Sequence, residues 1–448
     1  MRRHFLGFRG TWAAVLCAAL LFSGCGGDKA PDTKSAPAAK PAPKAAAKPA
    51  KKAAAKPARS TTPDNLPEAL VLGLAQFPPK GKGPPKPLPA TMTFLARQNG
   101  EWVVSQIDDT DSDVFHKVLH YTTPQGEEVL LSGGGSKAML KLWRKTDAGH
   151  VAETIWEKDF GGRFSRMRDI EVGDLYGDGT SVIAVATHDQ GVVALIKPDG
   201  EGYAVEELDL EPNTFVHEVE IGDLDGDGVL EVYATPSEPN KLDGSTQSGR
   251  VTRYVPAKGE GRVVVADLGD RHAKEILVED LDGDGSDELY VIVEGNYDKK
   301  TKSLSRKLEI RRYQAGTDPT KGVVIGEFDD YLGRFLTAGD LDGDGQMELV
   351  AALKSAGVWM LTPGAKPDSP WKKKLIDRKS GGFEHASIIA DLDRDGRSEL
   401  YVVSDKDGEI RRYTWEDGKP VREVIHKRTG GNTVFTWNIM PIPAELAP

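Results

Sequence analysis

The sequence predicts an all-β fold, a seven-bladed β-propeller of four-stranded blades, and three features carry this prediction. An acidic segment recurs five times, with its first aspartates 49, 57, 60 and 51 residues apart, which is about the length of one blade. An apolar run rich in β-branched residues follows, as expected of a buried strand. The last two strands of a unit recur seven times, near residues 92–107, 139–157, 192–207, 250–266, 307–327, 357–376 and 409–425.

The five acidic segments share aspartate at their first and fifth positions and glycine at their sixth. Each is expected to connect the first and second strands of a blade, and turns then lead to the third and fourth strands. The segments begin at Asp174, Asp223, Asp280, Asp340 and Asp391.

The two ends of the folded region complement each other. Residues 68–72 match a second strand, and residues 92–107 supply a third and a fourth, but no opening strand precedes them. Residues 432–439 form an opening strand with no later strands of its own. We therefore expect the C-terminal strand to complete the first blade of a propeller over residues 63–448, which closes the ring and removes exposed sheet edges.

The acidic segments have the composition of calcium loops. Calcium takes six to eight oxygen ligands, and a tight loop can place alternate side chains around one ion. Positions 1, 3, 5 and 9 supply carboxylates, position 7 supplies a carbonyl, and Gly228 and its equivalents permit the turn. Four loops are complete and predict about four structural Ca²⁺ sites: Asp223, Asp225, Asp227, Val229, Glu231; Asp280, Asp282, Asp284, Ser286, Glu288; Asp340, Asp342, Asp344, Gln346, Glu348; and Asp391, Asp393, Asp395, Arg397, Glu399.

Two units depart from this pattern. The loop at Asp174 has Tyr176 and Val182 at its third and ninth positions, so weak metal binding or none is expected. The first unit, near residues 121–128, has no aspartates and should be metal-free. The alternative for all the loops is a set of Asx-turns without any ion. Repulsion between converging carboxylates argues against that alternative.

The recurring pattern Asp-x-Asp-x-Asp-Gly-x-x-Glu resembles FG-GAP/VCBS-type repeats, the family that also forms the propeller of integrin α subunits. The resemblance covers roughly residues 110–430. It implies a propeller with calcium loops, and some relatives of this repeat type occur in polysaccharide lyases and phospholipases.

The N-terminus has the zones of an export signal. Arg2 and Arg3 precede an apolar stretch that ends at Ser23-Gly24-Cys25, and residues 21–25 resemble a lipobox. We expect a lipoprotein signal over residues 1–24, lipidation of Cys25 and a membrane anchor in the cell envelope; the alternative is an ordinary cleaved signal. Residues 25–62, rich in Ala, Pro and Lys, should form an extended tether. Cys17 lies within the signal, so the exported domain has no disulfide.

Five basic side chains lie six residues before the first aspartate of an acidic loop, and a sixth lies at the comparable place in the first unit. We expect them to ring the mouth of the channel on the face away from the calcium loops, as a candidate site for an anionic ligand. The alternative is neutralisation by nearby carboxylates, among them Asp169, Glu218, Glu275 and Glu384. The ring comprises His116, Arg168, His217, Lys274, Arg334 and His385.

A binding protein is the functional prediction. The net charge of −11 argues against a nucleic-acid partner, because such proteins need a basic face. Long loops after second strands, at residues 77–89, 236–249 and 294–303, are candidates for contact with an envelope protein or a glycan, or tolerated insertions. The sequence carries none of the common catalytic motifs, and no catalytic residues are assigned. The alternative is a carbohydrate-active, lyase-like or lipid-active enzyme with its site at the channel mouth.

Overall fold

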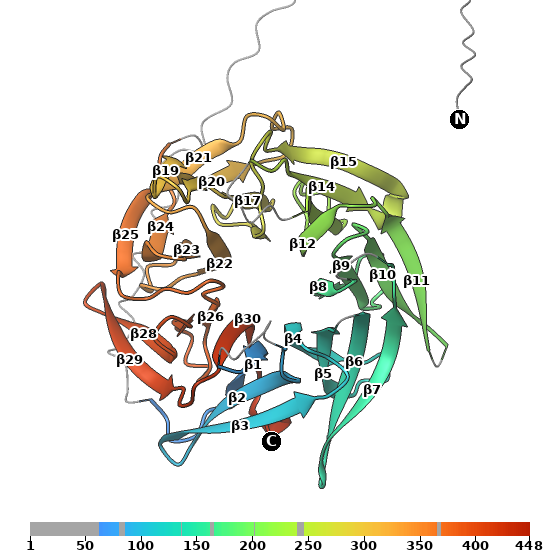
Figure 1. Ribbon diagram of the computed structural model, residues 1–448, viewed down its shortest axis with the longest axis vertical. Helices are drawn as coiled ribbons and strands as arrows, with labels where there is room; N and C mark the ends of the chain where they lie inside the picture. Colours follow the sequence, from blue (N-terminus) through green and yellow to red (C-terminus); the bar gives the residue numbers. More distant parts are fainter. Residues whose placement is uncertain are drawn as a thin grey trace, which may run out of the picture. The chain divides into compact units, whose positions relative to one another are not determined.

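The computed structural model describes residues 62–79, 86–135, 137–161, 165–200, 202–239, 246–364 and 369–448. Apart from Thr62, the predicted signal, the lipidation site Cys25 and the tether lie outside the described residues. The described chain forms seven four-stranded antiparallel sheets, which stand in a ring (Figure 1) and confirm the predicted fold class. Among the described residues no helix is long and apolar enough to cross a membrane.

The strands of each blade run in order from the channel to the outer rim. Blade 1 contains β30 (Thr433–Pro443), β1 (Glu68–Phe77), β2 (Ala90–Gln98) and β3 (Glu101–Asp109). Blade 2 contains β4 (Phe115–Thr122), β5 (Glu128–Gly134), β6 (Ala138–Thr146) and β7 (Gly149–Lys158). Blade 3 contains β8 (Met167–Gly173), β9 (Val182–Thr187), β10 (Val193–Asp199) and β11 (Gly202–Asp209). Blade 4 contains β12 (Phe215–Gly222), β13 (Glu231–Ser237), β14 (Arg250–Val255) and β15 (Glu260–Asp267).

The remaining blades follow the same order. Blade 5 contains β16 (Ile276–Glu279), β17 (Glu288–Val293), β20 (Leu308–Tyr313) and β21 (Val323–Phe328). Blade 6 contains β22 (Gly333–Gly339), β23 (Glu348–Leu353), β24 (Gly357–Thr362) and β25 (Lys372–Asp377). Blade 7 contains β26 (Ser387–Ala390), β27 (Glu399–Ser404), β28 (Glu409–Glu416) and β29 (Lys419–Lys427). Two short 3₁₀ helices are η1 (Pro256–Lys258) and η2 (Ala444–Leu446).

An additional hairpin extends from blade 5. It consists of β18 (Asn296–Asp298) and β19 (Ser303–Arg306), which pair antiparallel. The sequence predicts a long loop at residues 294–303, whereas the structure places most of this segment in the hairpin. The ring of Tyr297 stacks on the ring of Tyr331, with centroids 5.0 Å apart.

The C-terminal strand closes the ring as predicted. β30 pairs antiparallel with β1, from Glu68 opposite Pro443 to Phe77 opposite Thr433. The two strands lie side by side although they come from opposite ends of the described chain (Figure 1). This pairing leaves blade 1 with the same four strands as the other blades.

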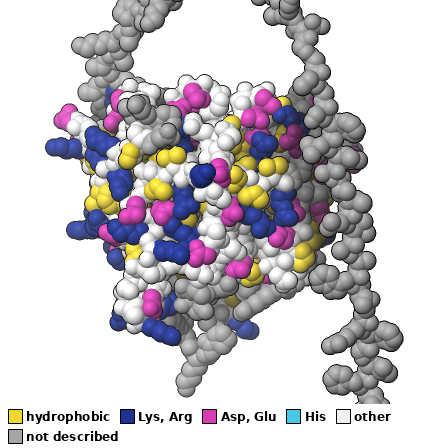
Figure 2. All heavy atoms as spheres, turned by 90° about the horizontal axis from the view of Figure 1, so that it is seen from above, with side chains coloured by type: hydrophobic (Ala, Val, Ile, Leu, Met, Phe, Trp, Pro, Cys, Tyr) yellow, Lys and Arg dark blue, Asp and Glu magenta, His cyan; other side chains and the backbone are white. Residues whose placement is uncertain are grey.

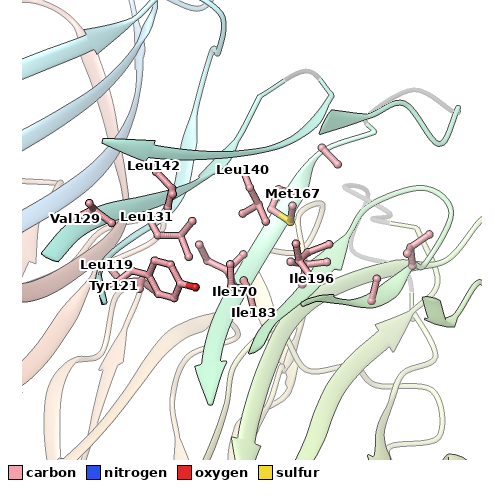
Figure 3. Packing of buried hydrophobic residues seen from close by; sticks show 14 residues of the cluster. Leu119, Tyr121, Val129, Leu131, Leu140, Leu142, Met167, Ile170, Ile183 and Ile196 are labelled. Carbon is pink, nitrogen blue, oxygen red and sulfur yellow. The ribbon is translucent and has the colours of Figure 1, made fainter. Parts of the chain in front are cut away.

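The hydrophobic core is divided among the interfaces between neighbouring blades. Seven clusters of buried residues occur in the described chain, each formed by two adjacent sheets, and one of them joins blades 7 and 1. In the cluster between blades 2 and 3, Leu119 and Leu131 pack towards Ile170 and Ile183 (Figure 3). The sheets hold one another by apolar packing, since most strands of each blade have both faces covered.

Glycine allows the end of an inner strand to approach the next blade. A Cβ atom at Gly222 would lie 2.3 Å from Cγ1 of Val278 in blade 5. We expect Gly222→Ala to lower the free energy of unfolding by about 1–3 kcal/mol, because the packed neighbour must move. Gly261→Ala is the matched control, since its Cβ would meet nothing within 4 Å. Urea denaturation of both variants measures the difference, and an equal stability of the two would contradict this close packing.

Candidate functional site: the acidic loops and the channel mouth

Each acidic loop connects the inner strand of a blade to the second strand, and its first aspartate organises the backbone. In blade 4, Asp223 accepts hydrogen bonds from the backbone N–H groups of Asp227 at 3.1 Å and Gly228 at 2.7 Å. Asp227 in turn accepts one from the N–H of Val229 at 2.9 Å. Left-handed backbone angles at Gly226 and Gly228, with φ of 67° and 83°, make this tight turn possible.

The carboxylates of these loops converge. In four loops, three side chains each bring an oxygen to within 4.8 Å of the other two. Carboxylate oxygens are hard ligands of the kind that calcium binds. The four groups are Asp223, Asp225, Asp227; Asp280, Asp282, Glu288; Asp340, Asp342, Asp344; and Asp391, Asp393, Asp395. Coordination by the carbonyls of Val229, Ser286, Gln346 and Arg397 stays a prediction.

The glutamates at the ninth position are buried, and three of them have a protein cation beside them. Arg253 lies 2.8 Å from Glu231, Arg312 lies 2.6 Å from Glu288, and Arg412 lies 3.2 Å from Glu399. A tyrosine hydroxyl two residues further along donates to the same carboxylates, from Tyr233, Tyr290 and Tyr401. In these blades the charge of the ninth position is already compensated within the protein.

Blade 6 lacks that compensation. Val350 stands where blades 4, 5 and 7 have a tyrosine, and the residue opposite it in β24 is Met360 instead of an arginine. Glu348 is 1% exposed and accepts a hydrogen bond from the N–H of Leu341 at 3.0 Å. Burial, followed by the neighbouring loop aspartates, raises the pKa of Glu348 to about 7.

A cavity of about 180 Å³ adjoins the blade 6 loop and is lined in part by Asp340, Asp342, Trp415 and, from the blade 7 loop, Arg397. The loop therefore combines three converging aspartates, a buried glutamate without a protein cation, and space beside the carboxylates. Its donor set fits a divalent cation with oxygen ligands better than those of the three arginine-containing loops.

The loop at Asp174 provides an internal comparison. Its first aspartate makes the same bonds to the backbone, to the N–H groups of Asp178 at 3.1 Å and Gly179 at 2.8 Å. Tyr176 occupies the third position, and its hydroxyl donates to Glu206 at 3.0 Å. The turn thus keeps its shape without a convergent acidic set.

The channel mouth lies at the opposite ends of the inner strands, and β-bulges shape it. In β4, β8, β12 and β22 the register shifts at the predicted ring residue, and in β30 it shifts at Trp437. A bulge places two residues opposite one and redirects side chains. A cavity of about 190 Å³ lies here, and four of the six predicted ring residues line it: His116, Arg168, Lys274 and Arg334.

The other two predicted ring residues do not line this cavity. His217 is 1% exposed, and its Nδ1 lies 3.3 Å from Nε2 of His188. His385 is fully buried, with Nε2 2.7 Å from the hydroxyl of Ser380 and Nδ1 2.8 Å from the carbonyl of Leu353. Neither histidine lines the cavity, so the structure brings four of the six predicted ring residues together there.

The histidines of the ring also differ from the expected basic side chains. Burial, followed by the charge of Arg168, lowers the pKa of His116 well below its ordinary value. Burial lowers the pKa of His385 to about 4. At neutral pH these imidazoles are uncharged, and the cationic side chains at the mouth are Arg168, Arg334 and Lys274, whose pKa burial lowers to about 7.

Two of the four carboxylates expected to neutralise the ring have other partners, whereas Glu384 and Glu218 act on the charge of Arg168. Asp169 lies 3.2 Å from Nζ of Lys117, and Glu275 accepts a hydrogen bond from the N–H of Leu336 at 2.6 Å. Nε of Arg334 lies 3.3 Å from Glu294. Lys117, Glu294 and Trp437, whose ring lies 4.8 Å below the Arg168 guanidinium, were missed by sequence reasoning because bulge positions cannot be located without the register.

Residues 174–234 and 280–351 match the FG-GAP-like repeat. Each matched segment spans two consecutive acidic loops, and the loop at Asp391 lies outside both. No curated protein sequence matches this chain.

Three solved structures are similar to the chain at low identity. A putative 6-phosphogluconolactonase from Bacteroides fragilis gives a TM-score of 0.47 and 12% identity, covering 86% of this chain and 100% of that one. Its counterpart from Bacteroides uniformis gives 0.47 and 11%, covering 85% and 100%. An α-L-arabinanase of Penicillium chrysogenum gives 0.41 and 13%, covering 72% and 93%. These values carry no conclusion about chemistry, whereas the repeat match agrees with the loops described above, and the chain is a seven-bladed β-propeller that contains FG-GAP-like repeats.

Proposed function

We propose that this protein is a calcium-stabilised lipoprotein of the cell envelope whose propeller binds a protein or glycan partner. The blade 6 loop is the observation that supports calcium binding. Glu348 is 1% exposed there, beside three converging aspartates. Blades 4, 5 and 7 have an arginine beside the equivalent glutamate, and blade 6 has Met360 at that position. A bound Ca²⁺ supplies the missing positive charge and adds to the stability of a domain without disulfides.

The envelope location rests on the sequence. The signal-like segment ends at Cys25, and the following 37 residues are poor in large apolar side chains, which suits a tether between a lipid anchor and a folded domain.

The binding face that we propose is the one around the channel mouth, away from the acidic loops. Phe383 is 37% exposed there, and its ring packs against Phe435 with centroids 5.8 Å apart. Lys354 lies over the rings of Tyr331 and Phe383, at 4.5 Å and 5.8 Å. Exposed aromatic rings combined with cations are typical of recognition surfaces. By contrast, one side of the ring has Lys and Arg interspersed with Asp and Glu (Figure 2).

Affinity capture from detergent-solubilised envelopes, together with binding to immobilised glycans, tests this function. Phe383→Ala is expected to reduce recovery of the partner about tenfold, because a central aromatic contributes about 1–2 kcal/mol to such contacts. Val151→Ala removes another exposed apolar side chain, from the outer strand β7, and should leave recovery unchanged. Equal recovery with both variants would refute this binding face.

A carbohydrate- or lipid-active enzyme is the second candidate, and the cations inside the mouth cavity are the observation that favours it. Turnover of an acidic polysaccharide or a phospholipid that is lost in Arg334→Gln would establish this alternative.

A further inference from the structure

Two of the cations at the channel mouth have no ion pair among the described residues. Lys274 is 6% exposed and Arg168 is 9% exposed, and both line the cavity of about 190 Å³. The Arg168 guanidinium contacts the face of Trp437 at 4.8 Å. Isolated buried charges are costly, because water is removed and no opposite charge replaces it. We call Arg168, Lys274, Arg334, Glu384 and Trp437 the mouth site.

Polar atoms without a hydrogen-bond partner among the described residues surround the same cavity. They include acceptors and a donor: Oε1 of Glu384, Nε2 of His116 and Nε1 of Trp437. His116 contacts the carbonyl of Met167 through Nδ1 at 2.6 Å, so Nδ1 carries the proton and Nε2 is free to accept one. Buried polar groups are normally paired, and this concentration of unpaired atoms indicates a ligand site.

We propose that the mouth site binds a small hydroxylated monocarboxylate, of the kind found in sugar acids, with its carboxylate between Arg168 and Lys274. This inference rests on the proposed binding face and specifies its ligand. The hydroxyl groups donate to Glu384 and His116, and the ring of Trp437 lies against the carbon skeleton.

The charges of the channel favour a single negative charge on the ligand. When Lys274 is ionised, three cations at the mouth stand against Glu294 and Glu384, which leaves a net charge of +1. Deeper in the same cavity lie five carboxylates with one cation, Lys117: Asp169, Glu171, Glu218, Glu220 and Glu275. A carboxylate balances this charge, whereas a phosphate dianion exceeds it.

The groups that face Lys274 come from several blades. Arg168 on β8 and Arg334 on β22 repel its charge, while Glu294 after β17 and Glu384 before β26 attract it. Burial is the largest influence and lowers the pKa of Lys274 to about 7. Ionised Lys274 therefore destabilises the ligand-free fold below pH 7, and this cost disappears as the pH rises to the ordinary lysine value.

Calorimetric titration of the full chain with galacturonate, galactose and phosphate tests the proposal. Galacturonate should bind. Galactose, which lacks the charge-assisted contact, and phosphate, which lacks the hydroxylated carbon skeleton, should each bind at least about tenfold more weakly. Lys274→Met and Arg168→Gln should each weaken galacturonate about tenfold or more, while Lys197→Met, a control on the outer part of blade 3, leaves binding unchanged.

Stability and pH separate this role from a structural one. Without ligand at pH 6, Lys274→Met should melt at the same temperature as the natural chain or at a higher one. If Lys274 had a structural role instead, its replacement would lower the melting temperature. The affinity of the natural chain should fall as the pH rises above 7, and Lys274→Met should not show that dependence. Full affinity in Lys274→Met, or binding of galactose as tight as galacturonate, would overturn the proposal. If the mouth site bound only peptides with a free C-terminal carboxylate, the proposal of a hydroxy acid ligand would be overturned. The proposed binding face would remain.

Discussion

A chain ending at residue 432 is expected not to form a closed propeller. The missing β30 pairs along the whole length of β1, and its Ile439 and Ile442 are each 1% exposed in the clusters that join blade 1 to its two neighbours. Each of these side chains contributes about 1.5–3 kcal/mol through burial alone, and the loss also exposes the edge of β1. The combined loss is comparable to the about 5–15 kcal/mol by which a typical domain is stable.

Circular dichroism and gel filtration of the shortened chain measure this effect. A chain ending at residue 443 is the matched control, because it keeps β30 and loses only η2, whose Leu446 is buried. It should fold with stability reduced by about 2–5 kcal/mol. Addition of a peptide of residues 433–443 should restore the fold of the shorter chain by strand addition. A chain of residues 1–432 that melts like the full chain would show that closure by β30 is unnecessary.

Calcium is expected to raise the melting temperature, and Glu348→Gln should remove the largest part of that gain. An ion held only by the folded state adds about 2.7 kcal/mol per site at a free concentration a hundredfold above the dissociation constant. Without calcium, Glu348→Gln should be as stable as the natural chain or more stable, because the variant no longer buries an uncompensated carboxylate. Thermal denaturation with calcium and with a chelator gives both values.

Glu288→Gln in blade 5 is the control for this variant. It removes the buried Glu288 carboxylate beside Arg312, whose side chain is 4% exposed, and leaves Arg312 paired with Asp282 at 2.5 Å. The expected cost is about 3 kcal/mol with or without calcium. If Glu348→Gln and the natural chain gained equally from calcium, the blade 6 loop would not be the main site.

The sequence was sufficient to predict the ring because its signals are local. Aspartate and glycine at fixed positions specify the turns, and the acidic turns return once per blade with the strands that follow them. The unpaired opening strand at residues 432–439 predicted β30 by elimination. The hairpin β18–β19 was missed because its short strands lack an apolar alternation, and it lies outside the blade.

The side-chain environment could be predicted only in part. The pairing of Arg253 with Glu231 depends on the register between β13 and β14, although the recurring Arg-Tyr pairs at residues 253–254, 312–313 and 412–413 are a signal that sequence reasoning could have used. The buried position of His385 could not be predicted, and there its imidazole is bonded to Ser380 and to the carbonyl of Leu353. Periodicity indicates which residues lie on the same face of a strand, but it does not indicate how deeply each of them is buried.

A crystal structure grown with calcium, with anomalous scattering used to locate the ions, would show which acidic loops hold calcium. The account predicts the strongest calcium peak in the blade 6 loop, about 2.3–2.6 Å from oxygens of the set formed by Asp340, Asp342, Asp344 and Glu348, and no peak in the loop at Asp174. A blade 6 loop without a peak at saturating calcium, or a peak at Asp174 instead, would contradict it.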